Sequence, residues 1–271
     1  MSEIASAPAV VRLEHVTKTF PRGSVTALQD IDLELAPGEF VSLIGPSGCG
    51  KSTLLRLIGD LVEPTSGAIT VNGKSARQAR KDGVYGIVFQ DAVLFDWRSV
   101  AKNIALPLEM LGWERERRRS RVREMLELVE LSGFADHHPW QLSGGMQQRV
   151  AIARALAFQP ALLLMDEPFG ALDEMTRERL NLELLSIWDQ TDNTVVFVTH
   201  SISEAVFLST RVVVMSPRPG RIAGVVEIDL PSSRTAETRD TQRFFELVTQ
   251  VRELLRSRGE HLLPEEEAAL T

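Results

Sequence analysis

The chain has 271 residues, of which 44% are hydrophobic and 25% charged, a composition typical of a globular protein with a sizeable core. The net charge of −7 and the isoelectric point near 5.4 argue against a nucleic-acid partner, because phosphate contacts need clustered Lys and Arg. A lone Cys49 excludes an internal disulfide, and neither a signal peptide nor a run of about 18 apolar residues is seen, so we expect a cytoplasmic chain that reaches a membrane only through a partner.

The first elements along the chain are predicted to be antiparallel strands. VVRLEHVTKTF (10–20) and DIDLELAPGEF (30–40) have the alternation and the turn residues of such strands. We expect them to form a small β-sheet beside a larger one.

Four continuous apolar runs predict the larger sheet. They are FVSLIG (40–45), VYGIVFQ (84–90), ALLLMDE (161–167) and TVVFVTH (194–200). Continuous rather than alternating runs are typical of parallel strands buried on both faces. Each run ends in polar or glycine-rich residues, and ligands of parallel sheets bind beyond the carboxyl ends of the strands. We therefore expect the chemistry to gather at that edge.

The segment between Gln90 and Pro160 has a helical pattern. MLGWERERRRSRVREMLELVEL (110–131) places Leu and Val at helical spacing, which predicts a helical subdomain inserted into the α/β core. The charge run 114–124 fits a solvated helix face, with a basic docking patch as the alternative. Further along, AGVVEIDL (223–230) predicts an edge strand, and a C-terminal helix is expected at about 241–257 before a frayed acidic tail, EEEAALT.

The stretch GPSGCGKST (45–53) fits a phosphate-binding loop, since it follows a predicted strand and precedes the helical LLRLIG. Its glycines let the backbone wrap a phosphate, and the amides at the helix start carry partial positive charge. Lys51 adds a full charge, and the Ser52 hydroxyl is placed to ligate Mg²⁺. Cys49, inside this loop, is interpreted as a tolerated small residue rather than a redox switch.

The ends of the other predicted strands supply the remaining chemistry. Asp166 is suited to hold Mg²⁺ through water, and Glu167 to orient or deprotonate an attacking water. His200 can stabilise charge that develops on a γ-phosphate, and Gln90 can ligate Mg²⁺ or position water.

Together with LSGGMQQR (142–149), these pieces resemble the nucleotide-binding subunit of an ABC transporter over roughly residues 10–225. In that family the LSGG signature, at a helix start, contacts the γ-phosphate of ATP held by the opposite subunit. The resemblance implies that two copies face head to tail and sandwich two ATP molecules with Mg²⁺. It assigns this contact across the dimer to Ser143, Gly144, Gly145, Met146 and Gln147.

The resemblance also implies a fold and its parts. The fold is an α/β P-loop NTPase with a RecA-type parallel sheet, an N-terminal antiparallel β-subdomain and an inserted helical subdomain. Residues 1–271 would be one ABC ATPase domain. Its core would be 10–90 and 159–230, its helical subdomain 91–158, and its C-terminal helical extension 231–271.

Site roles follow from the same resemblance. Phe20 matches the residue that stacks on adenine, with a plain core phenylalanine as the alternative. Gln90 matches the Q-loop and Mg²⁺ residue, Asp166 the Walker B carboxylate, Glu167 the catalytic base, Asp173 the D-loop residue at the subunit interface, and His200 the switch histidine. The Walker A residues are Gly45, Pro46, Ser47, Gly48, Cys49, Gly50, Lys51, Ser52 and Thr53. The chain departs from many members at Met146, where they have Gln, and at Gly59-Asp60.

Three segments resemble the ATP-binding subunits of importers of nitrate, sulfonate, taurine or pyrimidine precursors: DAVLFDWRSVAKNIALPLEMLG, FGALDEMTRERLNLELLSIW and FVTHSISEAVFLSTRVVVMSPRPGRI. A peripheral subunit at the cytoplasmic face of the inner membrane is thus expected, joined to permease subunits and indirectly to a solute-binding protein. Candidate residues of the permease groove are Phe89, Phe95, Trp97 and Met110, with ordinary core packing as the alternative for each. The alternative functions are a soluble ABC-type ATPase acting on ribosomes, DNA or metal-cluster assembly, and an unrelated P-loop enzyme such as a small-molecule kinase.

Overall fold

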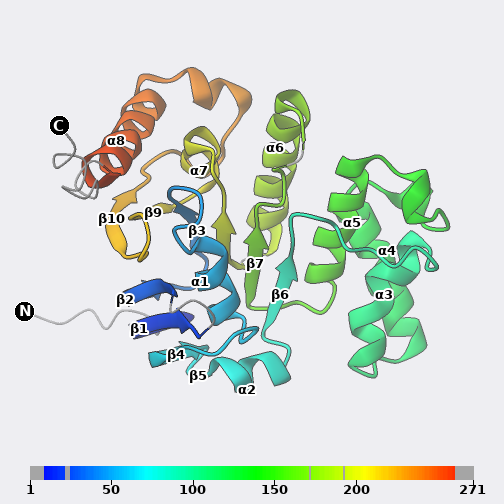
Figure 1. The fold of residues 1–271 in the computed structure, drawn as a ribbon. Coiled ribbons are helices and arrows are strands. Elements are labelled where there is room, and N and C mark those ends of the chain that lie inside the picture. Colours follow the sequence, from blue (N-terminus) through cyan, green and yellow to red (C-terminus); the bar gives the residue numbers. More distant parts are fainter. Residues whose placement is uncertain (1–8, 22–24, 171, 192, 260–271) are drawn as a thin grey trace, which may run out of the picture.

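A computed structural model describes residues 9–21, 25–170, 172–191 and 193–259 as two sheets with helices packed around them (Figure 1). The larger sheet has the order β10-β9-β3-β8-β7-β6. All of its pairings are parallel except that of β10 with β9. Its strands are β3 (Phe40–Ile44), β6 (Tyr85–Val88), β7 (Leu162–Asp166), β8 (Thr194–Val198), β9 (Arg211–Met215) and β10 (Ile222–Glu227). The four apolar runs are therefore parallel strands, as predicted, and β10 is the predicted edge strand.

Each central strand is buried on both faces. Phe40 and Ile44 of β3 belong to a core that includes Phe207, whereas Val41 and Leu43 belong to a second core. Four helices pack beside this sheet: α1 (Lys51–Ile58), α6 (Glu174–Thr191), α7 (Ile202–Leu208) and α8 (Gln242–Gly259). α8 packs against α7, β9 and β10, and it is the expected C-terminal helix. The acidic tail EEEAALT lies outside the described residues.

The smaller sheet has the antiparallel order β2-β1-β4-β5. It consists of β1 (Val11–Phe20), β2 (Val25–Leu35), β4 (Ser66–Val71) and β5 (Lys74–Ser75), with α2 (Ala76–Lys81) following. The N-terminal antiparallel sheet is thus confirmed, but its second strand was placed too late in the sequence. β2 begins at Val25, and Phe40 opens β3 of the other sheet, because the turn at Pro37-Gly38 separates the two strands.

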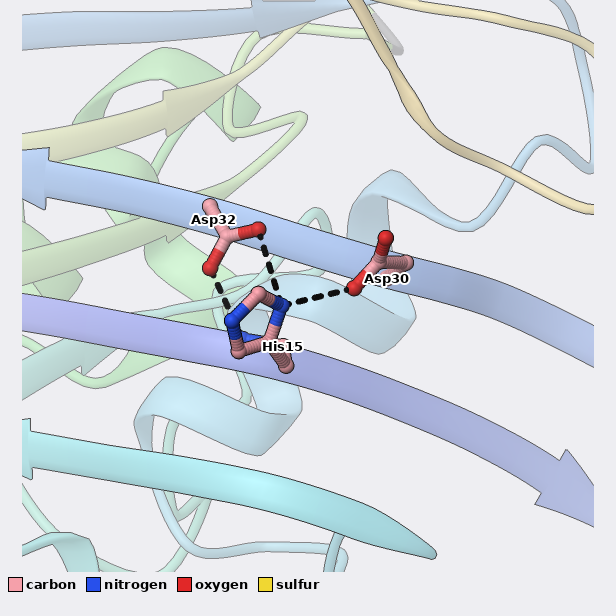
Figure 2. A group of neighbouring side chains, drawn as sticks. All are labelled: His15, Asp30 and Asp32. Carbon is pink, nitrogen blue, oxygen red and sulfur yellow. Dashed lines mark hydrogen bonds and ion pairs between the residues drawn. The ribbon is translucent and has the colours of Figure 1, made fainter.

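Irregular pairing of β1 with β2 gathers three polar side chains on an exposed face (Figure 2). His15 Nδ1 lies 2.9 Å from Asp30 Oδ1 and 3.4 Å from Asp32 Oδ2. The His15 amide also donates to Asp32 Oδ1 at 2.8 Å. The hydrogen bond with Asp30, helped by the charge of Asp32, raises the pKa of the imidazole above its ordinary value of 6.5.

Three helices lie together beyond the β6 edge of the larger sheet (Figure 1). They are α3 (Val100–Met110), α4 (Arg115–Leu128) and α5 (Gly144–Leu156), with short 3₁₀ turns at Ser132–Phe134 and Pro139–Gln141. The helical pattern of 110–131 is broken after Met110, where Gly112 takes a φ of +69° and the next helix begins at Arg115. In the part of the chain that is described, no helix is long and apolar enough to cross a membrane.

The charge run at 114–124 is mostly a solvated face of α4, although one arginine turns inward. Buried Arg121 donates to the carbonyls of Leu156, at 3.0 Å, and Ala157, at 2.8 Å. These bonds satisfy carbonyls at the end of α5, so they fix α4 against α5. Arg117 instead stacks on Trp113, with its guanidinium 3.8 Å from the ring centroid.

Candidate nucleotide site

The loop between β3 and α1 has the shape of a phosphate cradle. Gly48 and Gly50 adopt φ of +76° and +108°, and a Cβ at Gly50 would lie only 2.7 Å from Leu28 Cδ2. Glycine is therefore required at Gly50 for both conformation and space. α1 begins directly after this loop, at Lys51, so its free N-terminal amides face the loop.

Lys51 is nearly buried, and its ammonium donates to the carbonyls of Gly45, at 2.9 Å, and Pro46, at 3.2 Å. These two loop carbonyls therefore hold the Lys51 ammonium group beside the phosphate cradle. Cys49 is also buried, and burial raises the pKa of its thiol. A buried thiol with a raised pKa is poorly reactive, which favours the packing interpretation over a redox switch.

Two of the three residues expected to hold Mg²⁺, Ser52 and Asp166, lie next to each other. The Ser52 hydroxyl, at the start of α1, donates to Asp166 Oδ1, at the end of β7, over 2.7 Å. A hydroxyl and a carboxylate side by side are the oxygen ligands that Mg²⁺ takes beside a nucleotide's phosphates. The two side chains therefore fit that ion, which would neutralise phosphate charge during hydrolysis.

Glu167 and His200 face each other at the same edge. Glu167 turns the chain just after β7 with a φ of +47°, and its amide donates to the Val198 carbonyl at 3.0 Å. Its carboxylate Oε2 lies 3.4 Å from His200 Nδ1. The Gln90 amide is close by, since a Cβ added to Gly170 would lie 3.3 Å from Gln90 Nε2 and 3.6 Å from Glu167 Oε2. The Glu167 carboxylate thus has the His200 ring and the Gln90 amide as neighbours.

The buried carboxyl group of Glu204 fixes the turn that contains His200. The Thr199 hydroxyl donates to the Glu204 carboxylate, and the Ser201 amide donates to the Thr199 hydroxyl oxygen at 3.0 Å. Ser201 caps α7 through the Glu204 amide. Burial raises the pKa of Glu204. No feature of the sequence had distinguished Glu204 from other acids on a helix.

One cavity of about 330 Å³ is lined by nine of the predicted residues, while Gly45, Pro46, Cys49 and Asp166 do not line it. Phe20 lines it at one side and is 36% exposed, which excludes the alternative of a core phenylalanine. Gln90 is not part of this lining, although it adjoins Glu167 as described above. Arg218 lines the cavity and was not predicted. The predicted and additional lining residues include Phe20, Ser47, Gly48, Gly50, Lys51, Ser52, Thr53, Glu167, His200 and Arg218.

The signature residues lie elsewhere. Ser143 caps α5 by accepting from the Met146 amide at 3.3 Å, and both Ser143 and Gly144 are exposed. None of the signature residues is among the described residues that line the cavity. The Gln147 side-chain amide donates to the Pro139 carbonyl at 3.0 Å. Its part in a contact across the dimer stays a prediction.

The signature helix starts against the segment that contains Asp173. Asp173 Oδ1 accepts from the Thr176 amide at 3.0 Å, a cap at the start of α6 that lowers the pKa of the carboxyl group. Gly145 is buried at that point, with Thr176 Cγ2 3.6 Å from where a Cβ would be. The interface role expected of Asp173 stays a prediction as well.

Two further side chains of α5 were not predicted from the sequence. Buried Gln148 donates to the Phe89 carbonyl at 3.1 Å, one residue before Gln90. Arg154 donates to the carbonyls of Ala92, at 3.0 Å, and Val93, at 2.8 Å. The signature helix and the segment that follows β6 are therefore held together.

A phosphate cradle, Glu167 and His200 around one cavity, and Asp166 bonded to Ser52 beside it define a P-loop nucleoside triphosphatase. The ABC transporter family matches residues 28–170. A taurine import ATP-binding protein of Rhizobium johnstonii is 47% identical over 240 residues, which cover 86% of this chain and 90% of that protein. An uncharacterized ABC transporter ATP-binding protein of Methanocaldococcus jannaschii is 49% identical over 230 residues, or 83% and 85% of the two chains.

Solved structures agree with these relatives. A bacterial ABC transporter cassette solved as a dimer aligns with a TM-score of 0.71 and 38% identity, over 80% of this chain and 98% of that one. A post-hydrolysis state of such a cassette, bound to ADP and phosphate, aligns with a TM-score of 0.69 and 37% identity, over the same shares of 80% and 98%. The chain belongs to the ABC transporter family, as an ATP-binding subunit. It is an ATPase that uses ATP and Mg²⁺, and the predicted P-loop fold is confirmed.

Proposed function

We propose that this subunit powers the import of a small polar solute, of the taurine and sulfonate kind, through a membrane permease. The support is its similarity to taurine import ATP-binding proteins over most of both chains. The subunit would lie at the cytoplasmic face of the inner membrane, with a solute-binding protein acting on the permease from the other side. Nitrate and pyrimidine precursors are the other solutes within this proposal.

Hydrolysis would use the residues described above. Lys51 and the loop amides hold the phosphates, Ser52, Asp166 and Gln90 hold the metal, and Glu167 activates water beside His200. Phe20 would stack on the adenine ring. In a head-to-tail dimer, Ser143 to Gln147 of one copy would complete the site of the other, with Asp173 at the interface. The separation of the signature from the cavity supports this arrangement, as does the dimeric cassette.

An exposed aromatic patch is the surface at which we propose that the permease docks. The patch consists of Phe95, Trp97, His138 and Trp140. Trp97 is 74% exposed and its ring centroid lies 4.9 Å from that of Phe95. Trp140 is 65% exposed and stacks on His138 at 4.4 Å, while His138 Nδ1 contacts the Asp96 carbonyl at 3.1 Å. Exposed tryptophans at this density are unusual on a free surface and are typical of interfaces.

The patch is mechanically linked to the signature. Gln148 and Arg154 bind the carbonyls of residues 89, 92 and 93, immediately before Phe95. A shift of α5 on dimer closure would therefore move the patch and the permease bound to it. Of the other predicted groove residues, Met110 is 80% exposed and Phe89 is half-buried.

A pull-down tests the proposal. The tagged Glu167→Gln variant, which should hold ATP without hydrolysing it, is purified with ATP and Mg²⁺ from detergent-solubilised membranes of its own cell. A polytopic membrane protein recovered in roughly equal amount is the expected result. Ribosomal or DNA-repair proteins in its place would favour the soluble ATPase instead.

Two variants then test the docking surface. Trp97→Ala and Trp140→Ala should each reduce recovery of the permease at least tenfold, as interface tryptophans commonly do, while ATP hydrolysis by the isolated subunit stays unchanged. Phe245→Ala is the matched control, since Phe245 is 56% exposed but lies on α8. Equal recovery with all three variants would show that the permease binds elsewhere.

A further inference from the structure

The loop from Ser216 to Arg221, between β9 and β10, sits directly on the phosphate-binding loop. The Gly220 amide donates to the Ala27 carbonyl at 3.0 Å, and the Gln29 amide donates to the Gly220 carbonyl at 2.9 Å. Gly220 itself is packed so closely that an added Cβ would lie 2.0 Å from the Cys49 carbonyl oxygen. The position of this loop is therefore fixed relative to residues 48–50.

Arg218 extends from this loop into the wall of the nucleotide cavity. Its Nη2 and Nε donate to the Gly48 carbonyl at 3.0 and 3.2 Å. A guanidinium carries five N–H donors, so three remain for another acceptor. The side chain is exposed, and within the described residues it has no carboxylate partner.

The charge balance of the cavity favours an anionic occupant. Two permanent cations, Lys51 and Arg218, line it against one carboxylate, Glu167, although the chain as a whole carries a net charge of −7. An unpaired guanidinium beside a phosphate cradle is suited to a phosphate oxygen, for which it offers directed donors as well as charge.

We propose that Arg218 is a second cationic ligand of the nucleotide, which holds the Gly48 carbonyl with two donors and binds a phosphate oxygen of ATP or ADP with the others. The proposal rests on ATP occupying the cavity that Lys51 and Phe20 line. It concerns nucleotide binding alone and is independent of the permease and of the transported solute.

The test is calorimetric titration of the full chain with ATP, ADP and AMP, in Mg²⁺, at low and at raised salt. Arg218→Ala and Arg218→Gln should weaken ATP and ADP roughly tenfold at low salt, the size of one charge-assisted hydrogen bond at an exposed site. Arg218→Lys should stay within roughly threefold of the wild type. AMP, which reaches fewer phosphate contacts, should be affected less.

Arg221→Ala is the matched control, because it removes an equal charge from the same loop at a residue that does not line the cavity. If Arg218→Ala binds ATP as Arg221→Ala does, the proposal is wrong. It is equally wrong if Arg218→Gln keeps full affinity and salt dependence, since the guanidinium would then only brace Gly48. Lys51→Ala tests whether ATP occupies this cavity at all, separately from the role of Arg218. If that variant still binds ATP, the nucleotide site has been placed wrongly. Should Arg218→Ala fail to fold, the Lys and Gln variants decide.

Discussion

Gly220→Ala offers a sharp test of how the phosphate-binding loop is supported. The new methyl group would lie 2.0 Å from the Cys49 carbonyl oxygen and 3.2 Å from that of Ala27. Both neighbours are backbone, so neither can rotate away. The chain must shift, at a cost of about 1–3 kcal/mol for overpacking. Loss of the hydrogen bonds with Ala27 and Gln29 adds about 1 kcal/mol each. A total of roughly 3–5 kcal/mol lowers Tm by roughly 6–20 °C.

Thermal unfolding by circular dichroism measures this loss, and titration with ATP shows whether the displaced Cys49 also weakens the cradle. Gly133→Ala is the control, because a Cβ there meets nothing within 4 Å and the backbone is compatible with alanine. Gly133→Ala should leave Tm within about 2 °C of the wild type. If Gly220→Ala has the same Tm as Gly133→Ala and binds ATP normally, the loop does not support the phosphate-binding loop in the manner described.

Three further outcomes are expected. Glu167→Gln should lower phosphate release at least about 100-fold with ATP binding retained, since the neutral amide cannot accept a proton; equal loss of binding would contradict the assigned role. By NMR, His15 should titrate above 6.5 and return towards that value in Asp30→Asn; its stabilisation is present below the unfolded pKa and is lost as pH rises through the folded one. Arg121→Ala should cost roughly 2–4 kcal/mol in denaturant unfolding, because two carbonyls lose a buried donor, whereas exposed Arg119→Ala should change little.

The parallel sheet and the phosphate cradle could be predicted because their signals are local. A continuous apolar run requires burial on both faces, and GPSGCGKST has few other uses after a strand. The helical segment was predictable in type but not in extent. Gly112, with its φ of +69°, ends one helix and separates it from the next, and the apolar periodicity on both sides concealed that break.

Contacts between distant loops were beyond the reach of the sequence. Arg218 meets Gly48 across 170 positions of chain, and no local pattern specifies which carbonyl a guanidinium will find. The same holds for Gln148 and Arg154, whose partners lie about 60 residues earlier. Short strands such as β5, of two residues, carry too few side chains for any periodicity to emerge.

The exposed aromatic patch also allows docking to be followed by intrinsic tryptophan fluorescence. The chain has four tryptophans. Trp188 is shielded, with its ring 5.6 Å from Phe40 and its indole N–H bonded to the Asn193 carbonyl, whereas Trp97 and Trp140 face water. Trp113 is half-buried, so the two most exposed indoles, whose emission lies furthest to the red, belong to the patch. Any partner that covers it shifts the emission to the blue and shields it from iodide, so docking can be followed in real time on the unlabelled protein.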